Sequence, residues 1–217
     1  MKNYPWLKID TASIMFSSLS SPEWGRTFHM SAYFDKEINP DILRKACEDL
    51  RPYYPSMFSY LKRGFFWNYL ALTDKMPEIC SEDEKYLCPI VMKKDRTPDF
   101  RLTYSENRVT MDCSHSLGDG MGAGRFAEAL IARYDELMKG ADGKYVSAQN
   151  PSENTVNAFA KHYKPDGETA PEVTTKAFHF DEKYENQNLK LIFVDLPVDE
   201  IKKKAKEKGL SVTEYYV

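Results

Sequence analysis

The sequence predicts an α+β fold in which a mixed, mainly antiparallel sheet is flanked by helices. Three features of the 217-residue chain predict it. Apolar and polar residues alternate in several short runs, which is typical of half-buried strands. Pairs of such runs are joined by short turns, which indicates hairpins. Two longer segments carry apolar residues at helical spacing, which indicates amphipathic helices that cover one face of the sheet.

The first strand, helix and hairpin are expected before residue 73. Residues 27–34 alternate, and their inward face holds four apolar residues: Phe28, Met30, Ala32 and Phe34. Asn39 and Pro40 then open a helix as N-cap and first helical residue, and Arg51-Pro52 ends it. Two aromatic strands, 57–61 and 65–72, form a hairpin with Gly64 in its turn. The polar, acidic residues 75–89 are expected to form a surface loop.

A second hairpin pairs residues 100–104 with 109–113 around a polar turn. The long helix that follows reaches about Lys139, and Gly140 is placed to stop it. Residues 140–172 form a long connection with one short helix near 153–162. Strands are expected at about 173–180 and 189–196, followed by a lysine-rich helix that Pro197 opens and Gly209 stops.

The chain ends inside a helix-start signal. Ser211-Val212-Thr213-Glu214 fits a capping box, yet only three residues follow it. Because an isolated helix needs ~12 residues or more, we expect the chain to be the front part of a longer protein, with a frayed natural terminus as the alternative. The DNA downstream of the Val217 codon decides between the two.

Composition excludes several broad classes. Hydrophobic residues make up 42% of the chain and aromatic residues 13%, which is enough for a core. The net charge of −3 and a pI near 5.9 argue against a broad nucleic-acid-binding face. No apolar run approaches the ~20 residues of a membrane helix. Residues 1–6 lack the apolar h-region of a secretory signal, so no such signal is expected. The four cysteines form no C-x-x-C pair. They are therefore expected to be reduced thiols in a cytoplasmic protein.

Residues 114–124 form the one unusual stretch. A strand ends on His115, and a turn that contains Asp119 leads into the long helix. Four glycines are expected to let the backbone turn sharply and adopt positive φ: Gly118, Gly120, Gly122 and Gly124. A histidine held on such a turn can act as a general base. Asp119 is placed to accept a hydrogen bond or to pair with an arginine.

Other chemistries fit this stretch less well. Ser114 and His115 cannot act as a nucleophile and base, because neighbours on a strand point to opposite faces. A metal site would need more ligands than His115 and Asp119, and His162 and His179 lie far off without a motif. Residues 118–123 fit G-x-G-x-x-A, but an antiparallel hairpin precedes them instead of a βαβ unit. A P-loop would need Lys followed by Ser or Thr after its last glycine. No metal site is therefore predicted.

The run His115-Ser116-Leu117-Gly118-Asp119-Gly120 resembles the His-x-x-x-Asp-Gly motif of the chloramphenicol acetyltransferase-like superfamily. That group includes alcohol acetyltransferases, plant acyl-CoA-dependent acyltransferases, polyketide-associated acyltransferases and peptide-synthetase condensation domains. The strand–helix–hairpin order is similar too, and residues 196–213 resemble the beginning of the family's second half. The resemblance implies an N-terminal acyltransferase-like subdomain at 1–180 and the start of a truncated C-terminal subdomain at 181–217.

This resemblance also implies a reaction. His115 would remove a proton from the hydroxyl or amine of a small acceptor, which attacks an acyl thioester without a covalent acyl-enzyme. Asp119 and Gly120 would be structural, through an ion pair and through tight backbone packing. The expected co-substrate is acetyl-CoA or another acyl-CoA, with no permanently bound cofactor. Ser114 stands where condensation domains usually carry a second histidine, which favours acyl-CoA over a carrier-protein donor.

Two alternatives remain open from the sequence: a condensation-type domain that uses carrier-protein thioesters, and a non-catalytic binding module that retains the fold. The family's second motif, around Asp-Phe-Gly-Trp, is absent, and the active site of such enzymes lies between two halves. The expected partners are therefore the acceptor, the acyl-CoA and a missing C-terminal half, with no nucleic acid and no membrane span. Cys113 is expected in the core, and His29 is expected to face either a cleft or water.

Overall fold

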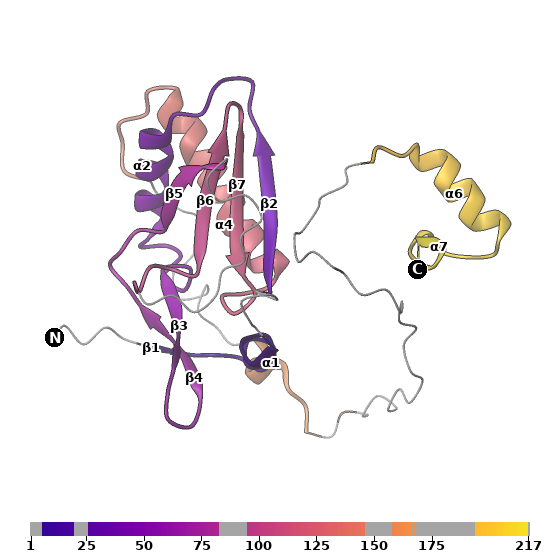
Figure 1. Cartoon of the computed structure of the whole chain (residues 1–217), viewed down its shortest axis with the longest axis horizontal. Helices are drawn as coiled ribbons and strands as arrows, with labels where there is room; N and C mark the ends of the chain where they lie inside the picture. The colour runs from indigo at the N-terminus through magenta and orange to yellow at the C-terminus, as the bar shows by residue number, and fades with distance from the viewer. Residues whose placement is uncertain are drawn as a thin grey trace, which may run out of the picture. The chain divides into compact units, whose positions relative to one another are not determined.

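The computed structural model describes residues 6–19, 26–82, 95–145, 158–165, 167 and 194–216. The chain divides into two compact units, Met1–Lys176 and Ala177–Val217. The first unit contains two sheets and the helices that cover them, and the second contains two short helices (Figure 1). The assignment of these units to two halves of an acyltransferase stays a prediction.

The main sheet has four strands in the order β2-β7-β6-β5. They are β2 (Thr27–Tyr33), β5 (Glu78–Ser81), β6 (Phe100–Ser105) and β7 (Arg108–Ser114). The pairs β2–β7 and β6–β7 are antiparallel, whereas β5 and β6 are parallel. The predicted α+β fold with a mixed, mainly antiparallel sheet is thus confirmed. The strand predicted at 27–34 is β2, and the hairpin predicted from 100–104 and 109–113 is formed by β6 and β7.

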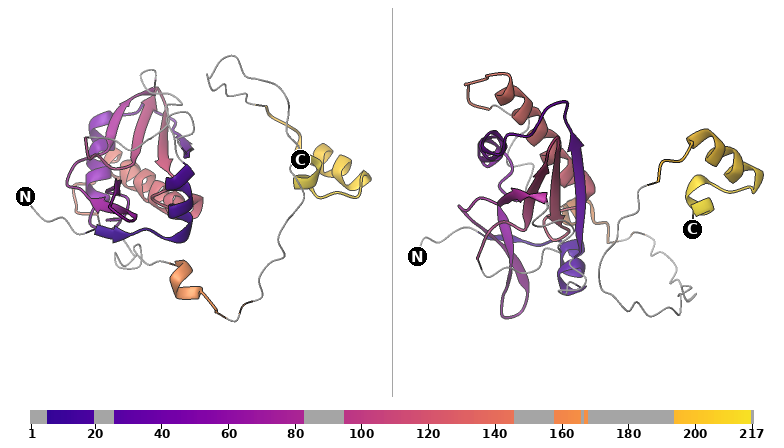
Figure 2. Two further views of the ribbon diagram at one scale, coloured as in Figure 1. Left: turned by 60° about the horizontal axis from the view of Figure 1, so that its bottom comes forward. Right: turned by 45° about the horizontal axis from the view of Figure 1, so that its top comes forward.

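Two helices, α2 (Pro40–Leu50) and α4 (Gly120–Met138), cover the same face of this sheet (Figure 2). Asn39 caps α2, because its side-chain oxygen accepts hydrogen bonds from the backbone N–H groups of Asp41 and Ile42 at 3.0 and 3.2 Å. The largest fully buried side chains of the core between helices and sheet are Phe58, Phe100, Phe126, Leu43, Leu50, Leu102 and Met111. The apolar faces of β2, β6 and β7 and the apolar stripes of α2 and α4 therefore point into this core, as the sequence predicts.

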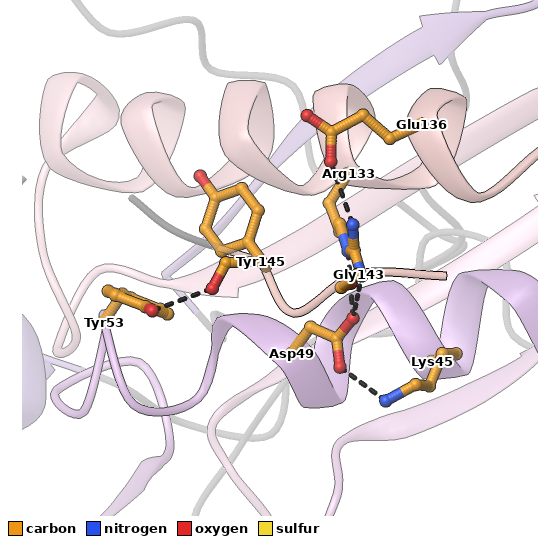
Figure 3. Close-up of polar contacts among 7 residues, drawn as sticks. All are labelled: Lys45, Asp49, Tyr53, Arg133, Glu136, Gly143 and Tyr145. Atoms are coloured by element: carbon orange, nitrogen blue, oxygen red, sulfur yellow. Dashed lines mark hydrogen bonds and ion pairs between the residues drawn. The ribbon is translucent and has the colours of Figure 1, made fainter. Parts of the chain in front are cut away.

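A polar cluster joins α2 to the far end of α4 (Figure 3). The buried guanidinium of Arg133 donates to Asp49 from Nε at 2.9 Å, to Glu136 at 3.0 Å and to the carbonyl oxygen of Gly143 at 2.6 Å. Lys45 donates to the other carboxylate oxygen of Asp49 at 2.5 Å. Because both charges of the Arg133–Asp49 pair are largely buried and hydrogen-bonded, the cluster fixes how the two helices pack.

The second sheet has the order β1-β4-β3 and is antiparallel throughout. It consists of β1 (Trp6–Lys8), β4 (Asn68–Leu72) and β3 (Ser59–Arg63). Leu61 and Leu70 on its inner face form a small core with Ile9, and Leu117 packs against it. The β3–β4 loop closes where the Gly64 N–H donates to the Trp67 carbonyl at 2.9 Å. A Cβ at Gly64 would lie 2.4 Å from that oxygen, so only glycine fits there.

Short helices complete the described chain: α5 (Ala158–His162) in the first unit, and α6 (Val198–Glu207) and α7 (Val212–Tyr216) in the second. Gly140 and Gly209 follow α4 and α6 with positive φ, as their predicted role as helix stops requires. The predicted capping box is also present, because Ser211 and Glu214 exchange hydrogen bonds between side chain and backbone N–H at 2.8 and 3.2 Å. Across the described ranges, no helix has both the length and the apolar character needed to cross a membrane.

Several expected elements differ in the structure. The predicted loop 75–89 contains β5, a short edge strand whose four residues are too few for an alternating pattern to stand out. Strand β4 starts at Asn68, because residues 64–67 form the loop. Helix α1 (Thr11–Leu19) was not expected, since its serines are weak helix formers. The predicted strand 173–180 lies outside the described residues. Of the predicted strand 189–196, only residues 194–196 are described, and they do not form a strand.

Candidate active site

His115 is held at the end of β7 by the backbone of the neighbouring strand. Its N–H donates to the carbonyl of Arg26 at 3.0 Å, which continues the β2–β7 ladder one residue beyond the pair Thr27–Ser114. Arg26 has a φ of +45°, a left-handed conformation that non-glycine residues adopt at a cost of about 1 kcal/mol or more. The sheet therefore fixes the backbone of His115 at the point where the strand gives way to the turn.

The His115 imidazole packs against two aromatic rings. Phe16 of α1 stacks on it at a centroid distance of 4.3 Å and an angle of 13°, and Phe28 of β2 packs at 4.5 Å. The Nδ1 atom is buried and has no hydrogen-bond partner among the described residues. The residue is half-buried, and because Nδ1 is buried, any reacting molecule would have to meet the ring at Nε2. The site thus presents one oriented nitrogen from an otherwise apolar setting.

Asp119 starts helix α4 as its N-cap. Its Oδ1 accepts a hydrogen bond from the Gly122 N–H at 2.7 Å, and its backbone carbonyl accepts one from Ala123 at 3.0 Å. Within the part of the chain that the structure describes, Asp119 forms no ion pair. Of the two roles that the sequence offered, the hydrogen bond is formed and the arginine partner is not.

The glycines of the motif do not adopt the conformation expected from the sequence. Gly118, Gly120, Gly122 and Gly124 all lack a positive φ, and the last three belong to α4. A Cβ at Gly120 would meet only the Met30 methyl group at 3.9 Å, so the expected tight backbone packing is absent there. Gly122 is the close position, because its Cβ would lie 3.3 Å from Asp119 Oδ1. These glycines therefore reduce the number of side chains at the start of α4 and do not introduce a left-handed turn.

The N-cap geometry predicts how substitutions of Asp119 behave. Asp119→Ala should destabilise the protein by about 1 kcal/mol, because the Gly122 N–H loses its acceptor. Asp119→Asn should retain most of the stability, since an amide oxygen caps as well as a carboxylate. Urea denaturation measures both. If the two variants lost the same stability, a charge and not a cap would be the role of this residue.

His29 lies on the opposite face of the sheet from the helices and forms a polar row across the strands. Its Nδ1 bonds to the carboxylate of Asp112, whose other oxygen accepts a hydrogen bond from Arg101 Nε at 2.5 Å. Asp112 and Arg101 are buried, whereas the His29 side chain is 35% exposed. His29 therefore faces outward, and the structure does not bring it together with His115.

The remaining candidates add no metal or nucleophile. His162 is exposed at the end of α5, and His179 lies outside the described residues. Among the described side chains, no group of three or more His, Cys, Asp or Glu could hold a metal ion. Cys47 and Cys113 are unpaired and buried, and burial raises the pKa of both thiols. Cys113 is thus a core residue, as its phase in the strand predicts, and Cys88 is not described.

No protein family and no curated protein matches the sequence, but solved structures match the fold. The starter condensation domain of rhizomide synthetase RzmA aligns with 70% of the chain at a TM-score of 0.54 and 12% identity. Polyketide synthase associated protein 5 from Mycobacterium tuberculosis aligns with 69% at 0.50 and 15%. A chain in the complex of the X-domain and OxyB from teicoplanin biosynthesis aligns with 68% at 0.51 and 13%.

The chain has the chloramphenicol acetyltransferase-like fold. The resemblance expected from the motif is thereby confirmed at the level of the fold, which condensation domains share. The chain spans 42%, 38% and 36% of the length of these three structures, which agrees with an N-terminal half. Within this fold, His115 lies on the strand-to-turn junction where the sequence places it.

Sequence reasoning missed two residues of the site. Phe16 belongs to a helix that was not expected, so nothing in the sequence linked it to His115. Arg26 holds the His115 backbone through its carbonyl oxygen, which any residue type could supply. Phe28 was correctly placed on the inner face of its strand by the alternation of residues 27–34, but its contact with His115 depends on the β2–β7 register.

Proposed function

We propose that this chain is part of an acyltransferase that moves an acyl group from a thioester to a hydroxyl or an amine, with His115 as the general base. The observation that carries the proposal is the half-buried His115 ring at the strand-to-turn junction, which packs against Phe16 and Phe28 and has its Nδ1 buried. The fold supports it, because condensation domains are built on the same scaffold.

In this mechanism Nε2 of His115 takes the proton from the acceptor O–H or N–H. The acceptor oxygen or nitrogen forms a bond to the thioester carbonyl carbon, and the carbon–sulfur bond then breaks. The leaving thiolate takes the proton back from the imidazolium, so the products are the ester or amide and a free thiol. A base of this kind must lie roughly 2.6–3.2 Å from the proton donor and contributes about 10²–10⁴-fold in rate.

The proposed donor is an acyl-CoA. A variant of the RzmA starter condensation domain, with a TM-score of 0.51 to this chain, was solved in complex with C8-CoA and Leu-SNAC. That complex supports an acyl-CoA as the donor and an amine as one acceptor class. Ser114, where condensation domains usually have histidine, favours the CoA donor over a carrier protein. Acetyl-CoA is the first donor to test. Asp119 caps the helix that starts beside the base, and Gly120 is the first residue of that helix.

A non-catalytic binding module is the second candidate. One similar structure is a complex between an X-domain and OxyB, so this fold also occurs in an assembly with another protein. A module of that kind would retain the scaffold and its aromatic contacts without thioester turnover.

Thiol release separates the two candidates. The product of the complete gene is incubated with acetyl-CoA or octanoyl-CoA and with a primary alcohol or an amino-acid amide, and free CoA is measured with a thiol reagent. The proposal predicts thiol release that depends on the acceptor. Calorimetric binding of a partner with no thiol release from any donor would favour the binding module instead.

A further inference from the structure

The loop between β3 and β4 exposes three consecutive aromatic side chains. Phe65, Phe66 and Trp67 are 94%, 81% and 65% exposed, and their loop projects from the end of the small sheet (Figure 1). Neighbouring rings contact one another, with centroids 4.7 Å apart for Phe65–Phe66 and 6.0 Å for Phe66–Trp67. Solitary exposed apolar residues are ordinary, but a contiguous apolar tip of this kind marks an interaction site.

Behind the tip, the sheet that carries it has an aromatic and basic surface. Lys62, Tyr69 and Lys8 lie in one cross-strand row, and Lys62 Nζ is 5.7 Å from the centre of the Tyr69 ring. Trp6, 58% exposed, contacts the same ring edge-on at 6.1 Å. Residues 6–8 and 59–72 include three cations, Lys8, Lys62 and Arg63, and no carboxylate. In a chain of net charge −3, this small sheet is locally basic, with Lys8 and Lys62 in the row beside Tyr69 and Arg63 on the opposite face at the end of β3.

These groups are arranged in layers. The apolar rings of Phe65, Phe66 and Trp67 stand furthest out, and Lys62 and Arg63 follow at the end of β3. The amphipathic Tyr69 on β4 pairs with Lys62 on one side and with Lys8 of β1 on the other, and Trp6 lies two residues before Lys8 on β1. A bilayer surface offers a zone that suits each of these groups. Its acyl chains lie below an interface that favours Trp and Tyr, and negative headgroups attract Lys and Arg.

We propose that the β3–β4 loop docks this protein on an anionic membrane surface. Phe65, Phe66 and Trp67 insert at the boundary between headgroups and acyl chains, while Lys8, Lys62 and Arg63 contact lipid phosphates. Peripheral binding strengthens with the apolar area buried in the membrane and with electrostatic attraction to anionic lipids, and the loop and the lysines behind it supply both. No spanning segment is needed for such docking.

A single-stranded nucleic acid fits the same surface less well. Binding of bases needs exposed ring faces interleaved with cations along a groove. Here the tip rings pack against one another, and the cations stand behind them instead of between them. A second copy of the chain would have to offer a complementary negative, apolar recess to this loop.

Vesicle flotation tests the proposal. The chain should float with vesicles of phosphatidylcholine and phosphatidylserine and much less with phosphatidylcholine alone. The triple variant Phe65→Ser, Phe66→Ser, Trp67→Ser should bind the mixed vesicles at least about tenfold more weakly, since each ring loses its buried apolar area. The double variant Lys62→Gln, Arg63→Gln should lose the preference for phosphatidylserine. Tyr163→Ser, which removes an exposed aromatic ring elsewhere, should bind like the natural chain.

The substituted side chains are exposed, so circular dichroism and melting should be unchanged in the loop variants. The proposal is overturned if the natural chain does not float with the mixed vesicles or if the triple variant floats equally well. It is also overturned if light scattering shows that the aromatic loop forms dimers and dimers alone account for flotation. Preferential binding of a single-stranded oligonucleotide over the vesicles would overturn it as well. Flotation is read without any turnover, so its failure leaves the proposed acyl transfer untouched.

Discussion

Replacing His115 by alanine is expected to lower kcat/KM for acyl transfer by about 10²–10⁴-fold, the contribution of a positioned general base. The acceptor would then have to lose its proton to water while it attacks the thioester. The melting temperature should fall by only a few degrees, because the variant loses the contacts of a half-buried ring with Phe16 and Phe28 but no side-chain hydrogen bond of Nδ1 to a described residue. The measurement is acceptor-dependent thiol release together with thermal unfolding.

His162→Ala is the matched control for this variant. That histidine is exposed at the end of α5 and has no role in the proposed site, so its removal should leave both rate and stability unchanged. Full turnover by the His115→Ala variant would remove this imidazole from the mechanism. Loss of turnover together with unfolding would assign it a structural role instead.

Asp49→Ala is expected to destabilise the first unit by about 3 kcal/mol, the lower end of the range for breaking a buried ion pair. The variant leaves the Arg133 guanidinium buried with only Glu136 and the Gly143 carbonyl as acceptors (Figure 3). Asp135→Ala is the control, because its pair with Lys139 on the same helix is exposed and is worth about 0.5 kcal/mol or less. Equal losses in urea denaturation would contradict the role assigned to the cluster.

The same carboxylate predicts a pH dependence. Burial acts to raise the pKa of Asp49, but the hydrogen bonds and charges of Lys45 and Arg133 outweigh it and hold this pKa below its usual value. A lowered folded-state pKa means that the unfolded chain binds the proton first as the pH falls. The contribution of Asp49 is therefore complete above its unfolded pKa of about 3.9 and is lost as the pH falls through the folded value. The stability difference between the natural chain and Asp49→Asn should shrink below about pH 4 and stay constant near neutrality.

Local patterns in the sequence determine much of this fold. Strand β2, the β6–β7 hairpin and helices α2 and α4 each combine a clear apolar period with a turn or cap residue at the expected end, such as Asn39 and Gly140. His115 was placed correctly for the same reason, since an alternating strand and an amphipathic helix enclose it.

What the sequence could not predict depends on contacts between distant segments. Phe16 reaches His115 only because α1 folds back against the end of the sheet, and its serine-rich helix carries little signal of its own. The row of His29, Asp112 and Arg101 exists only once three strands take their register. The motif glycines have ordinary φ values because Asp119 starts the helix before Gly120, so the turn needs no left-handed residue.

A single-turnover mass measurement tests the central claim most directly. The product of the complete gene is mixed with limiting octanoyl-CoA and an excess of a primary alcohol or amine. The masses of the protein and of the small molecules are then followed over time by mass spectrometry. The account predicts that the octanoyl group appears on the acceptor as free CoA is released, while the mass of the protein never changes. An acylated protein on the path to product, or no acylated acceptor with any donor, would contradict direct transfer at His115.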